Sequence, residues 1–471
     1  METVGVLVVS YGAREAAIID VLSRSKKYKV ELYIVDKQLN PFNFQHATKH
    51  VVIPSLNIQD INKFAQTHRD KIDFVMVGSE KPIIDGLRDL IETEVNIPVV
   101  CPKKEYAIEE SKVRQRLLFQ EIAPEANPRF KIFDPKNYQD KAQIKVEVYK
   151  WLDELNNQAV VKPDKPAAGK GVGVWGDHFA NREELFEHFM SNFQYSSVII
   201  EEKVDGEESS CMAFCDGKHF IPLPDTRDYK RAFDGDIGPN TGGMGSYKDV
   251  EDKLPFLTAA ERENEIKLAN KVFNGWSKQI NDPTALRGVP LYLAFMHTGK
   301  GIKILEINSR PGDPESINLF PIIKDDFIDV CYKMIEGNLQ KVELNKVATV
   351  LTYKVPPDYG GYRDIYPDKV SKVDIDTPID FAEADKLAKK YGDNIRIYPG
   401  SMELRKGKNY ALKSRAVGVL AIGDSIEEAR EISQEGARAI SGGGLWHRTD
   451  IAAPQHIAKS VKHMEALRNK T

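Results

Sequence analysis

The 471-residue chain has few of the features that mark several large protein classes. Its four cysteines, at positions 101, 211, 215 and 331, are too few and too scattered for a disulfide framework or a four-thiolate zinc site. The formal net charge of −4 leaves no basic excess for neutralising nucleic-acid phosphates. No apolar run approaches the length of a membrane span, and the first residues, METVGVLVVS, lack the basic segment of a signal peptide. We therefore expect a cytoplasmic protein that acts without nucleic acid or a membrane.

Two common phosphate-binding motifs are also missing. No G-x-G-x-x-G follows the first predicted strand, so a dinucleotide site is not expected there. The stretch VVKPDKPAAGKGVGVW, residues 160–175, has a Gly-Lys-Gly core, but Gly171 follows Lys170 where a P-loop needs a serine or threonine for its metal. What remains is a small-residue loop between two short strands, which either covers a ligand or is an exposed hairpin.

Short apolar strands alternate with helical patterns over the first hundred residues. Strands are expected in VGVLVVS, KVELYIVD, HVVIPS, IDFVMVGS and IPVVCP, with helices such as INKFAQTHR and IIDGLRDLIETE between them. This alternation indicates an α/β fold with a doubly wound parallel sheet, whose ligands bind at the carboxyl ends of the strands. Length and changes of pattern predict three domains: residues 1–110, residues 111–340 and a small α/β domain at 341–471.

The segment KILEINSRPGDPES, residues 303–316, carries the clearest chemistry. Glu306 and Asn308 are two positions apart on a predicted strand, so their side chains point to the same face. Two oxygen ligands suit Mg²⁺, which keeps several waters and bridges phosphates. Arg310 continues on that face, where its planar guanidinium can hold a carboxylate or an acyl phosphate. Because burying this set without a ligand would cost free energy, we interpret it as a metal and phosphate site.

Two further segments each have two interpretations. VIIEEKVDGEESS, residues 198–210, is either an adenine-binding hinge with a carboxylate for ribose hydroxyls or a solvated acidic turn. DGDIGPNTGGMGSY, residues 234–247, has glycines that let the backbone approach a ligand closely, as an alternative to a flexible linker. It belongs to the longest irregular stretch of the chain, and long loops inside a domain are usually functional.

Taken in order along the chain, these segments resemble the phosphoribosylamine–glycine ligase family of the ATP-grasp superfamily. The resemblance covers nearly the whole chain, from DFVMVGSEKPIIDGL through EESK, VVKPDKPAAGKGV, EEKVDGEESS, DYKRAFDGDIGPNTGGMGSY and LEINSRPGDPES to LWHRTDI. It implies an ATP-grasp fold in residues 111–340, with a mobile lid at about 128–205. It also implies a ligase of purine biosynthesis that joins glycine to 5-phosphoribosylamine through glycyl phosphate, giving glycinamide ribonucleotide, ADP and phosphate.

The resemblance assigns roles to the residues at matching positions. The ATP-binding residues would be Lys112, Lys162, Ala168, Gly169, Lys170, Gly171, Val172, Glu201, Glu202, Val204 and Glu208. The residues that bind glycine and 5-phosphoribosylamine would be Gly12, Arg14, Glu15, Gly78, Glu80, Asp236, Asn240, Thr241, Gly242, Gly243, Arg310, Gly312 and Asp313. Glu306 and Asn308 would hold Mg²⁺ or Mn²⁺, and the catalytic residues would be Arg310, Lys162 and Asp313. The implied partners are these small-molecule substrates, and the implied assembly is a monomer or a weak homo-oligomer.

The region expected to bind 5-phosphoribosylamine departs from the family pattern. SYGAREAA has Tyr11 and Ala13 where the family has glycines and Ala16 where it has histidine, and DKQLNPFN replaces a Pro-Gly-Asn turn. Tyr229 stands at another histidine position, and Pro311 stands at an aromatic one. Three alternatives follow: a ligase of the same branch with a different amine acceptor, a nucleotide-binding regulator without catalysis, and a kinase that releases a phosphorylated product.

Overall fold

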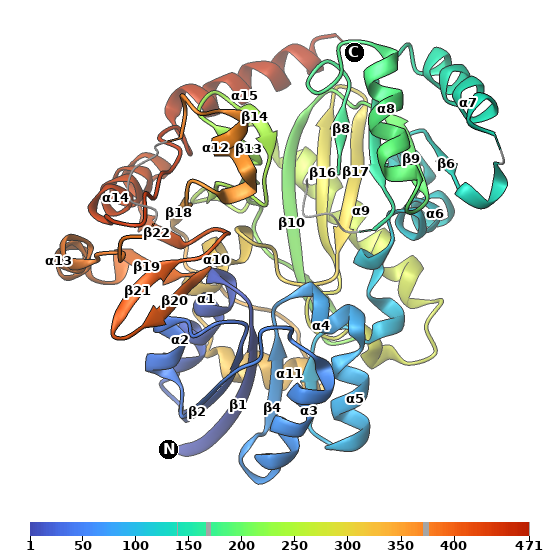
Figure 1. Ribbon diagram of the computed structural model, residues 1–471. Helices are drawn as coiled ribbons and strands as arrows, with labels where there is room; N and C mark the ends of the chain where they lie inside the picture. Colours follow the sequence, from blue (N-terminus) through green and yellow to red (C-terminus); the bar gives the residue numbers. More distant parts are fainter. Residues whose placement is uncertain (139, 166–170, 371–375, 471) are drawn as a thin grey trace.

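A computed structural model describes residues 1–138, 140–165, 171–370 and 376–470 of the chain (Figure 1). The first hundred residues form the predicted doubly wound sheet, whose five strands are all parallel and lie in the order β3-β2-β1-β4-β5. These strands are β1 (Glu2–Ser10), β2 (Tyr28–Asp36), β3 (Lys49–Val52), β4 (Phe74–Val77) and β5 (Val99–Val100). The helices between them are α1 (Ala13–Ser23), α2 (Pro41–His46), α3 (Ile58–Thr67), α4 (Glu80–Asp85) and α5 (Leu87–Glu94).

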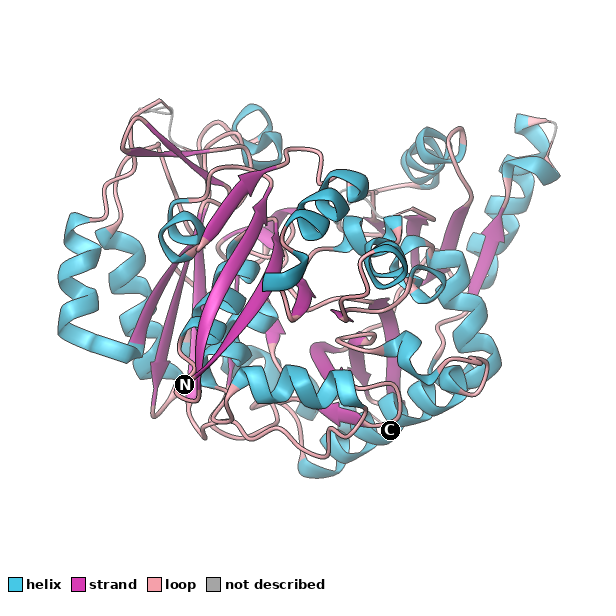
Figure 2. Cartoon of the chain, turned by 90° about the horizontal axis from the view of Figure 1, so that it is seen from below, coloured by secondary structure: helices cyan, strands magenta, loops and turns pink. Residues whose placement is uncertain are grey.

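The side chains of β1 alternate between two cores, because successive residues of a strand point to opposite faces. Val6 and Val8 pack with α1 and with α11 (Phe327–Glu336), which comes much later in the chain. Leu7 and Val9 pack with α3 and α5 on the other face. Helices therefore lie on both sides of the strands that begin at the N-terminus (Figure 2), and one of them is supplied by the central region.

The segment IIDGLRDLIETE, predicted as one helix, is divided between α4 and α5. Gly86 separates the two helices with φ 93°, in the left-handed region. Glycine adopts this conformation without the strain that a Cβ would introduce, and it commonly ends a helix there. The prediction of a continuous helix is therefore wrong at this residue.

The described residues between 130 and 202 form a separate small unit with its own apolar core, which we call the lid unit. Its four strands lie in the order β6-β9-β7-β8, and two helices pack against them. The elements are β6 (Phe130–Phe133), α7 (Lys141–Glu154), β7 (Ala159–Pro163), β8 (Gly173–Val174), α8 (Arg182–Phe193) and β9 (Val198–Glu202). This unit occupies the stretch predicted as a mobile lid, and its movement stays a prediction.

A second antiparallel sheet forms the centre of the molecule, in the order β11-β10-β16-β17. Its strands are β10 (Glu207–Cys215), β11 (Phe220–Pro222), β16 (Tyr292–Thr298) and β17 (Gly301–Asn308). Two helices, α6 (Lys112–Ile122) and α9 (Ala259–Ser277), share an apolar core with this sheet. Cys211 and Cys215 lie buried in that core, as their spacing on a strand predicts.

The C-terminal α/β unit is built on a sheet in the order β12-β15-β18-β22-β19. Its strands are β12 (Arg227–Asp228), β15 (Gly245–Lys248), β18 (Ala348–Lys354), β19 (Ile395–Pro399) and β22 (Val417–Gly423). The first two come from the predicted central domain, so this sheet extends back across residue 340. Two hairpins lie outside the larger sheets: β13 (Arg231–Phe233) with β14 (Ile237–Asn240), and β20 (Met402–Arg405) with β21 (Lys408–Ala411). The remaining α-helices are α10 (Glu315–Leu319), α12 (Tyr362–Ile365), α13 (Ala382–Tyr391), α14 (Ile426–Ala439) and α15 (Pro454–Arg468). Within the described ranges, no helix is both long and apolar enough to cross a membrane.

Candidate active site

A cavity of about 490 Å³ lies where the lid unit, the central sheet and the C-terminal sheet meet, and we call it the cleft. Most of the residues predicted to bind ATP, metal and substrates line it. These are Lys112, Lys162, Val172, Glu201, Glu202, Val204, Glu208, Asp236, Asn240, Thr241, Gly242, Glu306, Asn308, Arg310 and Asp313. Of the predicted loop over the phosphates, Ala168, Gly169 and Lys170 lie outside the described residues, and the carbonyl of Gly171 contacts His188 Nε2 at 3.0 Å.

The predicted metal ligands lie at the end of β17, on the face that borders the cleft. Glu306 Oε1 and Asn308 Nδ2 are 3.5 Å apart, as expected for side chains two positions apart on a strand. Burial alone would raise the pKa of Glu306. Three nearby lysines outweigh burial and lower that pKa below its ordinary value: Lys112, Lys230 and Lys162. The Glu306 carboxylate is therefore ionised at neutral pH, as a metal ligand must be.

Lys162 on β7 is held by a buried carboxylate of the hinge. Glu201 on β9 forms an ion pair with Lys162 and a second one with Arg116, whose Nε lies 2.6 Å from Glu201 Oε2. Burial lowers the pKa of Lys162. For Glu201, burial would raise the pKa, but the charges of Arg116 and Lys162 lower it. The Glu201 side chain thus positions Lys162 at the cleft, and contact of the hinge with adenine stays a prediction.

Lys230 lines the cleft, although no sequence motif predicted it. It follows β12 and forms ion pairs with Glu208, the predicted ribose carboxylate, and with Asp228 Oδ2 at 3.6 Å. The neighbouring Tyr229, which replaces a family histidine, points away into the core, where its hydroxyl accepts a hydrogen bond from the Ala452 backbone N–H at 3.0 Å. Tyr229 is therefore not part of the cleft lining.

Two predicted substrate-site glycines lie against buried carboxylates. Gly243 has φ 103°, and a Cβ there would come within 2.6 Å of Asp228 Oδ1. A Cβ on Gly312 would come within 2.5 Å of Glu315 Oε2. Both positions therefore need glycine because the carboxylates pack directly against the backbone. Asp228 and Glu315 themselves line the cleft, although the motifs did not predict them.

The predicted residues of the N-terminal loop form a helix cap beside the cleft. The Gly12 backbone N–H donates to Glu15 Oε2 at 2.9 Å, which caps α1. Arg14 Nη2 pairs with Glu15 Oε1 at 2.8 Å, and Glu15 is fully buried. A Cβ on Gly78 would lie 2.4 Å from Glu15 Oε1, so that glycine makes room for the cap. In the structure Glu15 orients Arg14, and its contact with substrate stays a prediction.

A row of alternating charges connects this loop to the cleft. Arg14 Nη1 donates to the carbonyl of Pro311 at 3.0 Å, and Arg14 Nη2 lies 3.9 Å from Glu80 Oε2. Glu80 Oε2 in turn lies 3.7 Å from Arg310 Nε, and Arg310 Nη2 lies 3.2 Å from Glu109 Oε1. Arg310 is therefore the link between the N-terminal loop and the predicted ATP and metal groups.

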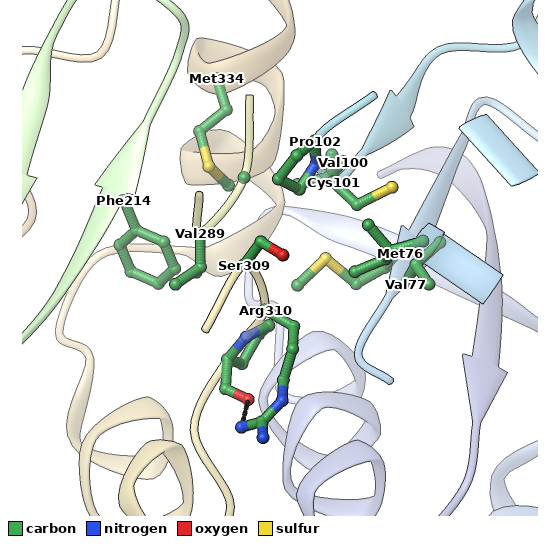
Figure 3. A pocket seen from close by; sticks show the side chains of 13 residues that line it. Met76, Val77, Val100, Cys101, Pro102, Phe214, Val289, Ser309, Arg310 and Met334 are labelled. Atoms are coloured by element: carbon green, nitrogen blue, oxygen red, sulfur yellow. Dashed lines mark hydrogen bonds between the residues drawn. The ribbon is translucent and has the colours of Figure 1, made fainter. Parts of the chain in front are cut away.

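The backbone next to Arg310 crosses a narrow apolar gap between the N-terminal sheet and the central region (Figure 3). Met76 and Val100 border the gap from the N-terminal sheet, while Phe214 and Met334 border it from the central region. These apolar contacts hold the segment that carries Arg310 and so fix where its guanidinium enters the cleft.

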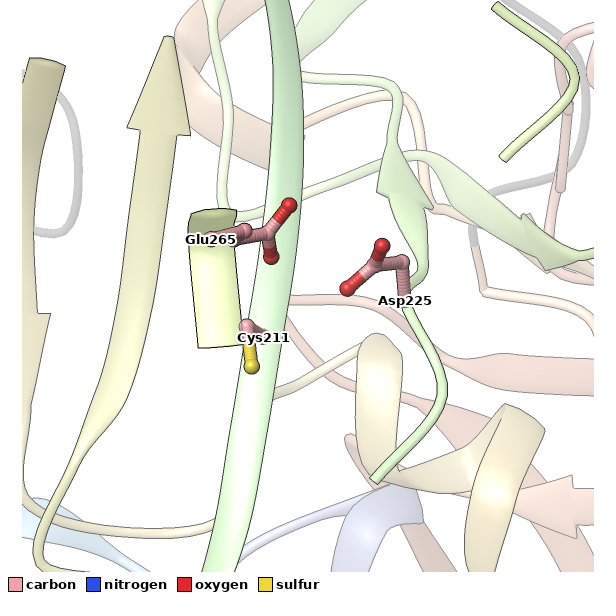
Figure 4. A group of neighbouring side chains, drawn as sticks. All are labelled: Cys211, Asp225 and Glu265. Atoms are coloured by element: carbon pink, nitrogen blue, oxygen red, sulfur yellow. The ribbon is translucent and has the colours of Figure 1, made fainter. Parts of the chain in front are cut away.

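One buried cluster outside the cleft has the composition of a metal site. Its members are Cys211 on β10, Asp225 between β11 and β12, and Glu265 on α9. Their three potential ligand atoms lie within 4.8 Å of one another (Figure 4). Arg262 lies among them: it forms an ion pair with Asp225, and its Nη1 lies 3.2 Å from Glu265 Oε1 and 3.5 Å from Cys211 Sγ. The positive charge at this cluster is therefore the guanidinium, and the cluster is a structural ion-pair network.

A further residue at the cleft comes from the C-terminal unit. Arg415 pairs with Asp313 Oδ2 at 2.9 Å and donates to the carbonyl oxygens of Gly242, of Gly243 at 3.3 Å and of Asp313 at 3.0 Å. Asp313 also accepts a hydrogen bond from the Tyr353 hydroxyl at 2.6 Å. No motif marks Arg415, because its partners lie at least 102 positions away in the sequence.

Comparisons with known proteins identify the family of the chain. The family "Phosphoribosylglycinamide synthetase, N domain" matches residues 4–110, and "Phosphoribosylglycinamide synthetase, ATP-grasp (A) domain" matches residues 131–316. The chain is 36% identical over 468 residues to a phosphoribosylamine–glycine ligase of Methanocella arvoryzae, covering 98% of this chain and 99% of that one. A ligase of the same name from Methanobrevibacter smithii is 35% identical over 470 residues, covering 98% and 100%.

Solved structures give the same fold. The crystal structure of phosphoribosylamine–glycine ligase from Thermotoga maritima matches with a TM-score of 0.71 and 25% identity, covering 95% of this chain and 100% of that one. The biotin carboxylase domain of the Hydrogenobacter thermophilus 2-oxoglutarate carboxylase, solved with the magnesium salt of ADP, matches with a TM-score of 0.66 at 13% identity, covering 99% and 95%, which shows the fold alone. The fold is thus an ATP-grasp fold with an N-terminal parallel-sheet domain, and the chain belongs to the phosphoribosylamine–glycine ligase family.

Proposed function

We propose that this chain joins glycine to 5-phosphoribosylamine at the expense of ATP, giving glycinamide ribonucleotide, ADP and phosphate. The observation that carries the proposal is a single cleft that contains two lysines, a carboxylate–amide pair and a buried arginine: Lys112, Lys162, Glu306, Asn308 and Arg310. Phosphoryl transfer to a carboxylate needs positioning and charge neutralisation, which these groups supply. Membership of the ligase family supports the choice of substrates.

The residues at the end of β17 fit a divalent cation. Glu306 is ionised, and the Asn308 amide can present its oxygen beside it, so both ligands are the hard oxygen donors that Mg²⁺ or Mn²⁺ binds. Such an ion, when bound, neutralises charge on the phosphates. Lys112 and Lys162 then bind the phosphate oxygens of ATP, and residues 168–172 cover them.

The reaction proceeds in two steps in this cleft. Arg310 holds the glycine carboxylate, one oxygen of which attacks the γ-phosphorus of ATP as the bond to the ADP oxygen breaks, giving glycyl phosphate. The amino group of 5-phosphoribosylamine then attacks the acyl carbon, phosphate leaves, and the amine loses a proton as the amide forms. The protein contributes orientation and electrostatic stabilisation rather than a covalent nucleophile.

Closure of the lid unit protects glycyl phosphate from water. An ion pair joins this unit to β13, which directly precedes the glycine-rich loop of residues 234–247: Asp177 Oδ2 lies 2.6 Å from Arg231 Nη2. Arg231 also donates to the carbonyl of Gly238 at 2.9 Å. Arg231 therefore connects the lid unit to the 234–247 loop, which is predicted to border the substrates. Closure of the lid unit over ATP is thereby coupled to ordering of this loop.

The amine binds on the N-terminal side of Arg310. Arg14 and Glu80 lie there in the charge row, at the carboxyl ends of β1 and β4 where a doubly wound sheet binds its ligands. Arg14 suits the phosphate of 5-phosphoribosylamine, because a guanidinium binds phosphate oxygens in pairs.

The test is ADP release with ATP, Mg²⁺ and glycine, with 5-phosphoribosylamine generated in place from ribose 5-phosphate and ammonia. The proposal expects release that requires both glycine and the amine, with glycinamide ribonucleotide identified by mass. Glycine-dependent release that other amines support better would assign a different acceptor, as the altered SYGAREAA loop allows. ADP release without amide would indicate a kinase, and ATP binding without turnover would indicate a regulator.

A further inference from the structure

The last helix of the chain contacts the hinge between the lid unit and the central sheet. This hinge, residues 203–206, joins β9 to β10, and its Val204 lines the cleft. The helix, α15, contacts β10 and β16 and extends from the C-terminal unit across the top of the molecule in Figure 1. His463 of α15 lies against two carboxylates: its Nδ1 is 2.7 Å from Glu207 Oε1, and its Nε2 is 3.3 Å from Asp205 Oδ1. A residue of the C-terminal unit thus bridges the end of the hinge and the start of β10.

The two glutamates at the start of β10 point to opposite faces, because successive side chains of a strand alternate. Glu208 lines the cleft, and Glu207 lies on the face toward α15. The Glu207 side chain is 10% exposed and pairs with Arg227 at 2.6 Å, and Arg227 also donates to the Glu208 carbonyl at 3.3 Å. Burial would raise the pKa of Glu207, but the charge of Arg227 and the hydrogen bond from His463 lower it below its ordinary value. An ionised carboxylate is therefore held from behind the strand that carries Glu208.

The hinge backbone is also packed directly against β16. A Cβ on Gly206 would lie 2.1 Å from the carbonyl oxygen of His297, the residue that pairs with Glu207 in the β10–β16 ladder. Two kinds of contact therefore restrict the hinge. Close packing comes from the central sheet, while the ion pairs to His463 come from the C-terminal unit.

The position of His463 is fixed because α15 is itself anchored. Arg468 Nη2 lies 2.6 Å from Glu261 Oε2 at the start of α9. Met464 and Leu467 are buried in the apolar core that includes the C-terminal sheet. His463 is thus held between buried and ion-paired neighbours on the same helix, and movement of the hinge relative to α15 must break its contacts.

We propose that His463 is a positioning residue of the ATP site, which holds the hinge in the place where it is predicted to bind adenine. This inference rests on the ATP-binding part of the proposed function and adds a residue of the C-terminal helix to it. An imidazolium has two N–H donors, one for each carboxylate that His463 meets. A hinge that is ordered before ATP arrives loses less conformational entropy when ATP binds. The affinity for ATP therefore depends on the docking of α15 behind β10.

The experiment measures the binding of ADP and of inorganic tripolyphosphate to the full chain by calorimetry. Tripolyphosphate has phosphate groups without adenine, so it makes no use of the hinge. His463→Gln keeps a polar side chain that is compatible with a helix, but it removes the charge and cannot bond both carboxylates. We expect this variant to raise the Kd for ADP about five- to tenfold, as loss of a partly exposed charge-assisted hydrogen bond predicts. The Kd for tripolyphosphate and the KM for glycine should each change by less than about twofold.

The controls separate positioning of the hinge from a general effect on the fold. In a Glu207→Gln background, His463→Gln should raise the Kd for ADP by less than about a further twofold, because the carboxylate charge is already gone. Lys462→Gln, at the neighbouring exposed position of α15, should leave both binding constants unaltered. Equal weakening of ADP and tripolyphosphate, or independent effects of the Glu207 and His463 changes, would overturn the inference.

An unchanged Kd for ADP in His463→Gln would overturn it as well. The binding measurement needs neither glycine nor the amine, so its outcome is independent of the ligation assay. Absence of glycine-dependent ADP release in the wild type would refute the proposed function, whereas loss of the difference between ADP and tripolyphosphate would refute the role of His463.

Discussion

The loop of residues 234–247, which is predicted to border the substrates, is fastened by an arginine from the C-terminal unit, and removing this arginine should loosen the loop. Arg415 bonds the carbonyl oxygens of Gly242 and Gly243 and pairs with Asp313. Replacing it by methionine keeps most of the side-chain volume, removes these bonds and leaves the Asp313 carboxylate with the Tyr353 hydroxyl as its remaining partner. We expect Arg415→Met to destabilise the closed arrangement of the loop.

The burial of the Arg415–Asp313 ion pair determines how much free energy its loss should cost. The Arg415 and Asp313 side chains are 15% and 10% exposed, so their ion pair is largely shielded from water. Removing one partner of a buried pair costs about 3–5 kcal/mol, and the small remaining exposure favours the lower end. Each 1.4 kcal/mol changes an equilibrium constant tenfold, so a loss of about 3 kcal/mol increases the open population of the loop roughly 150-fold.

Hydrogen exchange measures this opening directly, because three successive backbone amides of the loop donate hydrogen bonds. The backbone N–H of Thr241 donates to the Lys230 carbonyl at 2.7 Å, that of Gly242 to the Tyr359 hydroxyl at 3.1 Å, and that of Gly243 to Thr241 Oγ1 at 2.9 Å. Exchange at these amides should rise by about two orders of magnitude in Arg415→Met, while the central sheet is unaffected.

Two further variants make the test specific to Arg415. Arg415→Lys, which keeps the charge but loses the planar fork, should give an intermediate rate. Arg405→Met removes an arginine of the same unit that is 53% exposed and pairs with Glu403, and it should leave the loop unchanged. Exchange in Arg415→Met within about threefold of the wild type would show that Arg415 does not fasten the loop, and the reasoning from burial would be wrong.

Three other variants test the metal site, the amine site and the pH dependence of stability. Glu306→Ala should lower metal-dependent ADP release by about a thousandfold or more while the thermal melting curve stays cooperative, and near-normal turnover would remove Glu306 from the metal site. Arg14→Ala should raise the apparent KM for the amine about tenfold or more and that for ATP by less than about twofold, and equal effects would place Arg14 outside the amine site. His447→Gln tests the pH dependence of stability. Burial lowers the pKa of His447 to about 4 in the folded chain, whereas the unfolded chain binds this proton already below about pH 6.5. The free energy of unfolding of the wild type therefore falls as the pH falls from about 6.5 to 4. Between these pH values the melting temperature of the variant should fall by less than that of the wild type. Equal falls in the two proteins would show that His447 is not the group responsible.

Much of the fold was accessible from local sequence patterns. The five strands of the N-terminal sheet have apolar runs that alternate with helical periodicity, and all five form as predicted. Glu306 and Asn308 were predictable as a pair for the same reason, because spacing on a strand determines the face that a side chain occupies. The break at Gly86 was missed, since a single glycine inside a helical pattern is compatible with either a continuous or a divided helix.

The rest of the site depends on contacts between distant parts of the chain. Nothing in the sequence distinguishes Asp228 from the many other charged residues, and in the structure it is buried with Oδ1 against the backbone of Gly243. Glu315 follows the RPGD motif, but its place in the cleft lining depends on contacts with distant residues. One of these is the hydrogen bond from Tyr292, which is 23 positions away in the sequence. No local pattern encodes such burial, so the same letters could equally have described exposed carboxylates.

The C-terminal unit is connected to the loop of residues 234–247, which is predicted to border the substrates. Besides Arg415, the fully buried Arg448 pairs with Asp236 at 2.9 Å and with Asp450 at 2.7 Å, and Asp450 accepts a hydrogen bond from the Gly235 backbone at 2.7 Å. The loop is therefore fastened at both ends, while β15, which follows it, is a strand of the C-terminal sheet itself. Because the loop continues directly into that sheet, a shift of the C-terminal unit must move the backbone of the loop with it. The geometry of the predicted substrate site is thus determined in part by Arg415 and Arg448, which lie outside the predicted set of substrate-binding residues.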